Sequence, residues 1–375
     1  MRQLWVRTRT LRHEYEIVIG RNLLSKAGAQ TRAWLGDQVG RIALISNPKV
    51  SSLYGDTVVQ SLKGSGFSVS TWMTGDGERH KSLRTIENVL KFLNQSGLER
   101  SDGVVAVGGG VVGDVAGFAA AVYLRGVPFV QIPTTLLAQI DSSVGGKTGV
   151  NLPRGKNLVG SFHQPSGVLI DAETLATLPR RELTAGWCEC VKQGAVANRK
   201  LFKETTDYLS DRDGLKLSTG LEQLIASHCA FKASIVAADE REAADRRDSR
   251  SRRILNFGHT VGHALEAVTN YRHFRHGEAV GYGMLVAGEL SKNLGLLDQS
   301  ELELLRQAVS LCGPLPAIKG IDEGALRNAI TLDKKRARGH VQWVLLEGIG
   351  KPRIVDGKEI SPALLVQSMR AVFRS

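Results

Sequence analysis

Two histidines stand four residues apart in the segment Asn256–His263, at His259 and His263. On an α-helix this spacing places both imidazoles on one face, where they can converge on a metal ion or a substrate. A third histidine, His276, follows thirteen residues after His263. Glu189 lies in a helix-patterned segment seventy residues before His259. A carboxylate and two imidazoles on separate helices make a three-ligand Zn²⁺ site with open positions for substrate.

The alternative is that each of these histidines caps a helix or packs locally, without a metal. Glycines beside them weaken that alternative, namely Gly258, Gly262 and Gly277. A glycine inside a helix costs about 1 kcal/mol relative to alanine, and it is tolerated more readily where two backbones must approach closely. The histidine segments are therefore expected to pack closely around a shared site.

A glycine-rich turn, Gly108–Asp114, follows the apolar run Val104–Val107 and opens a helix-like stretch. In this context glycines let backbone N–H groups approach a pyrophosphate at a helix N-terminus. The turn departs from the G-x-G-x-x-G fingerprint, so a purely structural tight turn stays open as the alternative. Upstream, Asp76–Lys81 precedes a helix with Ser82 as its expected N-cap. That segment either binds ribose and phosphate or is a solvated loop.

A second polar loop, Pro133–Thr148, is rich in small, hydroxyl and charged residues and follows another predicted strand. Parallel sheets place ligands at this end of their strands, so the sequence predicts a binding loop. Its end resembles a P-loop, but Asp141 stands where that pattern requires glycine, which excludes an NTPase. Single cations elsewhere would surround a phosphate only if the fold gathers them, and each alone fits a solvated surface role: Arg125, Lys147, Lys156, Lys192, Lys232 and Arg252.

The chain has 375 residues, of which 42% are hydrophobic and 23% charged, with 41 glycines and 10 prolines. This composition fits a globular α/β protein and excludes collagen-like, disulfide-scaffold and wholly disordered classes. Four unevenly spaced cysteines are too few for a disulfide framework, so reduced thiols are expected. The first residues carry arginine where a signal peptide needs an apolar stretch, and no window suits a bilayer span. We therefore expect a cytoplasmic protein without membrane contact.

The net charge is +12, because 49 lysines and arginines exceed 37 aspartates and glutamates. A basic protein favours anionic partners without choosing between nucleic acid, membrane surface and phosphorylated metabolites. The densest basic run, Arg246–Arg253, has no interleaved aromatic residues to stack on bases, and no nucleic-acid fold signature accompanies it. We expect a small anionic substrate, no nucleic-acid partner, and a mobile, solvated loop or helix extension over 245–253.

The elements that position these residues change character along the chain. Short apolar runs at 42–45, 103–107, 129–132 and 168–170 predict parallel strands buried on both faces, and 83–93 has a helical pattern. From Glu182 onward the chain reads almost entirely as helices, for example over 277–294 and 300–310, with one late β-like segment at 341–346. The prediction is a Rossmann-like α/β domain over 1–175 and a mainly α-helical domain over 176–375.

Taken together and in this order, the motif blocks resemble the 3-dehydroquinate synthase family of the shikimate pathway, from about residue 40 to about residue 350. The blocks are Gly108–Asp114, Tyr123–Gly126, Pro133–Lys147, Gly155–Asn157, Glu189–Lys192, Asp239–Glu242, Asn256–His263, His276–Glu278 and Asp333–Lys335. The resemblance implies an N-terminal NAD-binding α/β domain, a helical metal-binding C-terminal domain, an active site in the cleft between them, and a homodimer.

The resemblance also implies roles for individual residues. The metal, Zn²⁺ with Co²⁺ as the alternative, would be held by Glu189, His259 and His276, while His263 would belong to a substrate-proton relay. The implied NAD contacts are Asp76, Gly77, Glu78, Arg79, His80, Lys81, Gly110, Val111, Val112, Gly113, Asp114, Thr134, Thr135, Lys147, Lys156, Thr174, Leu175, Ala176 and Thr177. The implied substrate contacts are Arg125, Asp141, Lys147, Asn157, Lys192, Lys232, Arg252, Asn256 and a lysine of the 334–335 pair. The chain is longer than the family spacing between Glu242 and Asn256, so Arg246 is the alternative to Arg252.

The implied reaction converts 3-deoxy-D-arabino-heptulosonate 7-phosphate to 3-dehydroquinate and phosphate. NAD oxidises a secondary hydroxyl, phosphate leaves by β-elimination, the NADH formed reduces the ketone back, and an intramolecular aldol step closes the ring. Three rival functions stay open. A glycerol-dehydrogenase-type enzyme would release free NADH, another sugar-phosphate cyclase would use the same machinery on a different substrate, and a nucleic-acid binder would show salt-dependent affinity.

Overall fold

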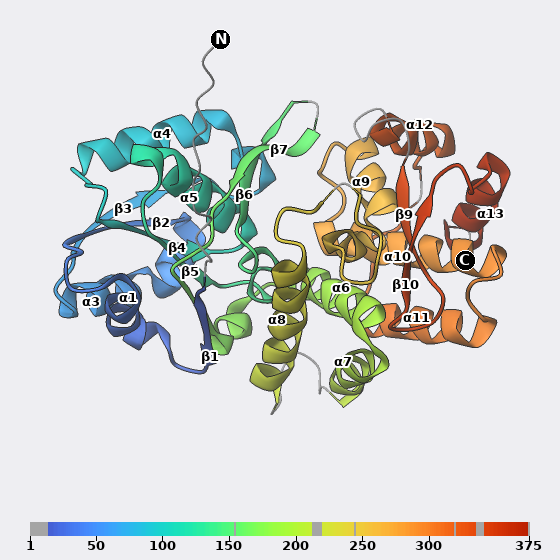
Figure 1. Cartoon of the computed structure of the whole chain (residues 1–375), viewed down its shortest axis with the longest axis horizontal. Helices are drawn as coiled ribbons and strands as arrows, with labels where there is room; N and C mark the ends of the chain where they lie inside the picture. Colours follow the sequence, from blue (N-terminus) through green and yellow to red (C-terminus); the bar gives the residue numbers. More distant parts are fainter. Residues whose placement is uncertain are drawn as a thin grey trace, which may run out of the picture.

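The computed structural model describes residues 14–153, 155–211, 220–243, 245–318, 320–334 and 341–373. Within them, an α/β part and a mainly helical part lie side by side (Figure 1). This is the fold class predicted from the sequence. The last strand of the main sheet ends at Asp171 and the next long helix begins at Arg180. The division of the chain at residue 175 remains a prediction.

The α/β part is built on a six-stranded parallel sheet with the order β1-β8-β5-β4-β2-β3. In that order the strands are Glu16–Gly20, Gly167–Asp171, Phe129–Pro133, Gly103–Gly108, Arg41–Ser46 and Ser68–Met73. The four central strands are buried almost throughout, as expected for apolar runs that are covered on both faces. The four strands predicted from the sequence are confirmed, and β1 and β3 form the edges.

Helices cover both faces of this sheet. On one face, α1 (Ala27–Leu35) and α3 (Asp56–Gly64) pack against Ile42 and Leu44 of β2. On the other, α4 (Leu83–Gln95) and α5 (Gly110–Val122) pack against Ala43 and Ile45. The predicted helix at 83–93 is confirmed as α4. Its N-cap is the predicted Ser82, whose side chain accepts a hydrogen bond from the backbone of Thr85.

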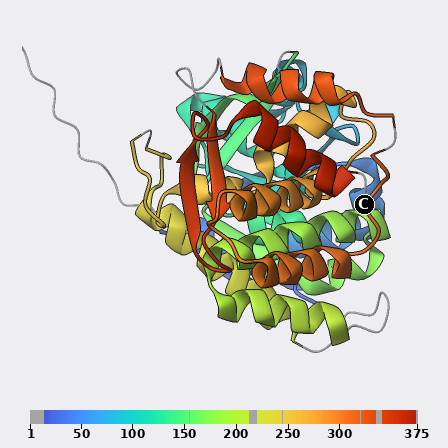
Figure 2. The same cartoon turned by 90° about the vertical axis from the view of Figure 1, so that its right-hand side faces the viewer.

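The C-terminal part is centred on α10, which contacts α6, α9, α11 and α13 (Figure 2). Its helices are α6 Arg180–Ala197, α7 Arg199–Asp211, α8 Leu221–Ala238, α9 His259–Val268, α10 His276–Asn293, α11 Gln299–Leu311, α12 Glu323–Lys334 and α13 Pro362–Phe373. The helices predicted at 277–294 and 300–310 are confirmed as α10 and α11. Within the described ranges, no helix is long and apolar enough to cross a membrane.

The predicted late β-like segment at 341–346 is confirmed as a strand, but the expectation of only one such segment was wrong. Strand β9 (Gln342–Leu346) pairs antiparallel with β10 (Pro352–Asp356). The sequence pattern missed β10 because it is short, begins at a proline and buries only Val355.

A separate two-stranded hairpin extends from the sheet toward α9 (Figure 1). It consists of β6 (Lys147–Leu152) and β7 (Gly155–Phe162), which pair antiparallel. The predicted binding loop at 133–148 therefore contains a short helical turn, η5 (Ala138–Ser142), and ends at the first residues of β6. This hairpin is the element through which the α/β part reaches the histidines.

Candidate active site

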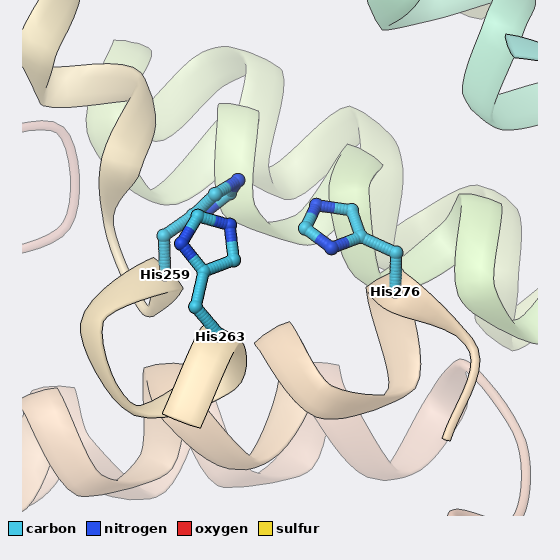
Figure 3. Close-up of side chains that lie close together, drawn as sticks. All are labelled: His259, His263 and His276. Atoms are coloured by element: carbon cyan, nitrogen blue, oxygen red, sulfur yellow. The ribbon is translucent and has the colours of Figure 1, made fainter. Parts of the chain in front are cut away.

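The three histidines converge, and helical spacing predicted this for His259 and His263. His259 and His263 lie on α9, and His276 is the first residue of α10 and points toward them (Figure 3). One potential ligand atom from each lies within 4.8 Å of those of the other two. The ring centroids of His259 are 5.2 Å from His263 and 5.0 Å from His276. Imidazole nitrogens at this separation can share one metal ion.

Two glycines permit this convergence. Gly258 precedes α9 with φ +78°, and a Cβ there would lie 2.8 Å from the backbone nitrogen of Met284 on α10. Gly277 follows His276, and a Cβ there would lie 1.9 Å from the carbonyl oxygen of Ala185 on α6. A side chain at either position would push the helices apart. Close backbone approach therefore brings the ligand-bearing turns of α6, α9 and α10 together.

Glu189 supplies the carboxylate of the set from α6. Its side chain is fully buried, and neither oxygen has a hydrogen-bond partner among the described residues. Lys192 Nζ lies 2.5 Å from Oε2 as an ion pair, and His276 Nε2 lies 3.6 Å from Oε1. A buried carboxylate is costly unless a cation or hydrogen-bond donors engage it. The residues present therefore fit a divalent metal held by Glu189 and imidazole nitrogens.

The three histidines differ in the hydrogen-bond partner of the ring nitrogen Nδ1. His259 Nδ1 lies 3.2 Å from the carbonyl oxygen of Phe257, and His276 Nδ1 lies 3.2 Å from Oε2 of Glu266. An acceptor at Nδ1 fixes the proton there and leaves Nε2 free to bind a metal. Across the described residues, no hydrogen bond holds the ring of His263, which is exposed. The pattern supports His259 and His276 as ligands and leaves His263 free to move a proton.

The electrostatics of the set follow from burial and from its carboxylates. Burial alone would lower the pKa of His276, but Glu266 and Glu189 raise it above the ordinary histidine value. Burial, Lys192 and His276 hold the pKa of His259 well below that value. Desolvation by neighbouring protein atoms is the main cause that lowers the pKa of His263, to about 4, and the nearby His276 is the second cause. His263 is therefore a neutral imidazole near pH 7 and can accept a proton.

A second cluster gathers predicted substrate residues around Asp141 on η5. Lys232 of α8 donates to both the backbone oxygen and the carboxylate of Asp141. Burial alone would raise the pKa of Asp141, but Lys232 and Lys192 hold it well below its usual range. Arg252, 3% exposed, donates to the carbonyl oxygens of Gly145 and Glu240 at 3.0 and 2.8 Å. These cations come from three elements and form a buried cluster, the cation cluster. It lies beside Glu189, His259 and His276, which we call the metal set.

Other predicted substrate residues are distributed around this cluster. Lys147, at the start of β6, forms an ion pair with Glu242. Asn256 ends the short helical turn η7 (Arg252–Asn256), three residues before His259, and is exposed. Arg125 is also exposed, and no ion pair among the described residues joins it to the cluster. Lys335 lies outside the described residues, as does the side chain of Lys334.

The glycine-rich turn lies where an open parallel sheet binds nucleotides. From β2 the chain continues outward to β3, whereas β4 is followed by β5 on the opposite side, so the strand order reverses between β2 and β4. Ligands bind outside the carboxyl ends of strands at such a switch point. Helix α5 begins at Gly110, directly after β4. A Cβ at Gly110 would lie 3.1 Å from Ser142 Oγ, so the turn and the η5 loop approach closely.

Several predicted NAD residues meet beside this turn. Lys81 is buried and donates to the side chains of Asp114 on α5 and Asn157 on β7. Thr134 follows β5, and its backbone donates to the carbonyl oxygen of Gly108 at 3.0 Å. Glu78, Arg79 and His80 form the short turn η3, and Thr174–Thr177 lies within η6 (Ala172–Thr177). The structure thus brings three separate predicted segments, around 81, 114 and 157, into contact.

The arginine-rich run is solvated over only part of its length. Arg247 and Arg250 are exposed, as expected. Ser251 and Arg252 are instead buried, because Asp239 accepts a hydrogen bond from Arg252 N at 2.8 Å and Ser251 Oγ lies 3.4 Å from the same carboxylate. Arg246 instead pairs with Asp248 at 3.0 Å and donates to the carbonyl oxygen of Ala238. The geometry supports Arg252 over Arg246 as the substrate arginine.

Sequence reasoning assigned no role to Glu266 or Glu242, two carboxylates that contact predicted site residues. Glu266 bonds His276 and Lys156, and Glu242 pairs with Lys147. The signal for Glu266 was available, because it stands seven residues after His259 and three after His263. That spacing repeats on one helical face. Glu242 lies in the Asp239–Glu242 block, but no spacing in the sequence connects it with Lys147, which stands 95 positions away.

Comparisons with known proteins agree on one family. The family described as 3-dehydroquinate synthase N-terminal matches residues 71–185, and that described as 3-dehydroquinate synthase C-terminal matches 186–336. A 3-dehydroquinate synthase of Synechococcus sp. is 44% identical over 349 residues, which cover 91% of this chain and 92% of the relative. One from Thermodesulfovibrio yellowstonii is 40% identical over 358 residues, covering 93% and 96%.

Solved structures show the same architecture. A 2-epi-5-epi-valiolone synthase of Streptomyces hygroscopicus, with NAD⁺ and Zn²⁺ bound, superposes with a TM-score of 0.88 at 26% identity over 99% of each chain. A 2-deoxy-scyllo-inosose synthase complexed with carbaglucose-6-phosphate, NAD⁺ and Co²⁺ gives 0.80 at 26% identity, covering 95% of this chain and 96% of the other. A glycerol dehydrogenase of Schizosaccharomyces pombe shares the fold at 0.67 and 16% identity, covering 98% and 91%.

Both family descriptions, read together with relatives aligned over nine-tenths of the chain, cover the glycine turn, the η5 loop and the helices that carry Glu189 and the three histidines. The chain belongs to the 3-dehydroquinate synthase family.

Proposed function

We propose that the protein converts 3-deoxy-D-arabino-heptulosonate 7-phosphate to 3-dehydroquinate and phosphate, with NAD and a divalent metal as cofactors. The observation that carries the proposal is that the proposed metal ligands lie beside a buried cluster of cations around Asp141. A metal- and NAD-dependent dehydrogenase needs the metal ligands but has no need of the cations. Only a substrate that brings and releases an anionic group accounts for the second as well.

The residues have distinct tasks in this proposal. Glu189, His259 and His276 would hold the metal, which we infer to be Zn²⁺ because one carboxylate and two imidazoles suit it, with Co²⁺ as the alternative. Bound there, the ion would act as a Lewis acid on a substrate hydroxyl oxygen. Lys192 lies 2.5 Å from Glu189 and faces the same region, so its ammonium is placed to hold negative charge on the substrate.

The cations of the second cluster would bind the phosphate and carboxylate of the substrate. Lys232 and Arg252 are both nearly buried, which strengthens their attraction for an anion. Asp141 keeps Lys232 in place, and Lys147, Asn157 and Asn256 would supply further contacts to the substrate. His263, neutral near pH 7, can exchange a proton with the substrate, and the phosphate that leaves is a second proton acceptor.

The cofactor site would lie at the reversal of strand order. The Gly110–Asp114 turn, Thr134, Thr135 and the 76–81 segment would bind NAD there, with the helix N-terminus of α5 facing its pyrophosphate. Bound NAD would accept and return a hydride at the same carbon of the substrate. We infer that the active site lies in a cleft between the two parts of the chain, which would limit the access of water to the intermediates.

We also propose a homodimer in the cytoplasm, with a small anionic substrate and no nucleic-acid partner. The exposed apolar side chains of the β6–β7 hairpin, Leu152, Leu158 and Phe162, support self-association, and four free, buried cysteines suit a reducing compartment. Light scattering at assay concentration should give twice the chain mass. A monomer that is fully active would contradict the dimer.

The test of the function is product identification. The protein is supplied with the heptulosonate phosphate, Zn²⁺ and catalytic NAD, and the products are followed by NMR. We expect 3-dehydroquinate and one phosphate per molecule. No phosphate from this substrate, together with phosphate release from another sugar phosphate, would favour the rival cyclase activity.

A further inference from the structure

Glu266 is a buried carboxylate of α9, and both of its oxygens are engaged. Its side chain is 3% exposed. Oε2 lies 3.2 Å from His276 Nδ1, and Oε1 accepts a hydrogen bond from Lys156 Nζ at 2.7 Å. His276 begins α10 and Lys156 lies on β7. Three elements therefore meet on one carboxylate.

The contact with His276 decides which nitrogen of that ring faces the metal set. A carboxylate at Nδ1 holds the proton there and orients the ring. In the neutral ring Nε2 then carries no proton and can bind a metal, and it lies 3.6 Å from Oε1 of Glu189. His276 lies on a different helix from His259, so helical spacing alone does not fix the direction of its ring.

The contact with Lys156 reaches across to the α/β part. Lys156 Nζ lies 3.9 Å from Glu78 Oε1 and 4.7 Å from the ring centroid of Tyr271. The next residue, Asn157, accepts a hydrogen bond from Lys81, which also contacts Asp114 on α5. Adjacent side chains of the hairpin thus reach the metal set on one side and the glycine turn on the other.

We propose that Glu266 positions His276 for the metal, and that Lys156 holds Glu266 in that role from the β6–β7 hairpin. This inference rests on the proposed metal set. It assigns Glu266 no contact with substrate, so Glu266 is a positioning residue. It also makes metal affinity depend on a lysine of the NAD-binding part of the chain.

The experiment is a Co²⁺ titration of the metal-free, full-length protein against a chelator of known affinity, with the visible absorption bands as a readout of ligand geometry. Replacing Glu266 by Gln should weaken Co²⁺ binding about 10- to 100-fold and shift the bands. Lys156→Met should weaken it by a smaller factor. The double variant should bind no more weakly than Glu266→Gln alone, because both changes act through one contact.

Glu289→Gln is the matched control, because Glu289 is an equally buried glutamate on α10 that pairs with Arg306 and Lys292 outside the site. It should leave Co²⁺ affinity unchanged. If Glu266→Gln does not fold by circular dichroism, Glu266→Asp, which retracts the carboxylate, should show the same weakening. Wild-type affinity and bands in a folded Glu266 variant, or additive effects of the two changes, would overturn the inference. A wild-type protein that binds no Co²⁺ would instead contradict the metal site itself.

Discussion

The metal set and the cation cluster lie side by side but are built in different ways. At the metal set, His259, His276 and the neighbouring His263 come from two consecutive helices, and their nitrogens lie within 4.8 Å of one another. Lys192, Lys232 and Arg252 come from α6, α8 and η7, and each is held by a carboxylate or carbonyl of the protein. The histidines are organised by local spacing, and Glu189 joins them from a distant helix, whereas the cation cluster depends on long-range packing throughout and on internal anions that keep the cations in place.

The two regions also differ in how their buried charges are balanced. In the cation cluster, Asp141 and Glu189 neutralise lysines that would otherwise repel one another in a buried region. Glu189 belongs to both regions, because it pairs with Lys192 and also faces His276. Metal binding would therefore change the charge that Lys192 experiences, and this shared residue is the place to test the comparison.

The largest expected effect is the loss of the metal. Chelation should abolish turnover, and His276→Ala should lower both metal content and kcat by about a thousandfold or more, since Lewis-acid stabilisation is worth several kcal/mol. Metal analysis of the purified variant and steady-state phosphate release measure the two. A His276→Ala protein that is active and holds a full equivalent of metal would remove His276 from the ligand set.

Breaking the shared ion pair should have the next largest effect. Lys192→Met leaves the fully buried Glu189 without its cation, which should lower the free energy of unfolding of the metal-free protein by about 3–5 kcal/mol. Added Zn²⁺ should restore much of that loss, so the variant should gain more from the metal than the wild type does. Thermal unfolding with and without Zn²⁺ measures this. Equal gains in the two proteins would show that Glu189 does not link the regions.

Two arginines of the basic run, Arg252 inside the cation cluster and Arg246 outside it, should differ in their effect on activity. Arg252→Ala should lower kcat/KM about 10- to 100-fold, because it removes a charge-assisted contact worth about 1.5–3 kcal/mol. Arg246→Ala, which alters a contact outside the cluster, should change it by about twofold or less. Arg252→Lys should recover part of the loss. Equal losses in the two alanine variants would contradict the assignment of Arg252.

The smallest expected effect concerns a histidine outside both regions, and it changes the pH dependence of stability without changing the reaction. His228 of α8 is fully buried between Thr205 and Gln193, and burial lowers its pKa to about 3. The unfolded chain takes up this proton near pH 6.5 and the folded protein does not, so stability is present above pH 6.5 and declines as the pH falls toward 3. The loss should reach about 2 kcal/mol at pH 5.

His228→Gln should flatten this part of the stability profile while leaving the dependence of kcat on metal unchanged. Denaturant unfolding at pH 7 and pH 5 provides the measurement. An unaltered slope in the variant would mean that other groups carry the acid sensitivity.

How far the sequence could predict the site follows from the same contrast. The helical spacing of His259 and His263 predicted a shared face, and the run after β4 predicted the glycine turn, because both depend on near neighbours in sequence. The burial of Arg252 could not be predicted, since it depends on Asp239 and Gly145, which lie 13 and 107 positions away. Strand β10 was missed for a different reason, its lack of a buried apolar pattern.

The central claim is that both regions serve one redox-neutral reaction. The most direct test is steady turnover of the heptulosonate phosphate with catalytic NAD, in which phosphate release and absorbance at the reduced-nicotinamide band are recorded together. We expect many molecules of phosphate released per molecule of NAD and no accumulation of NADH, because the hydride returns to the substrate before the cofactor leaves. NADH that appears in step with product would contradict it and identify a dehydrogenase.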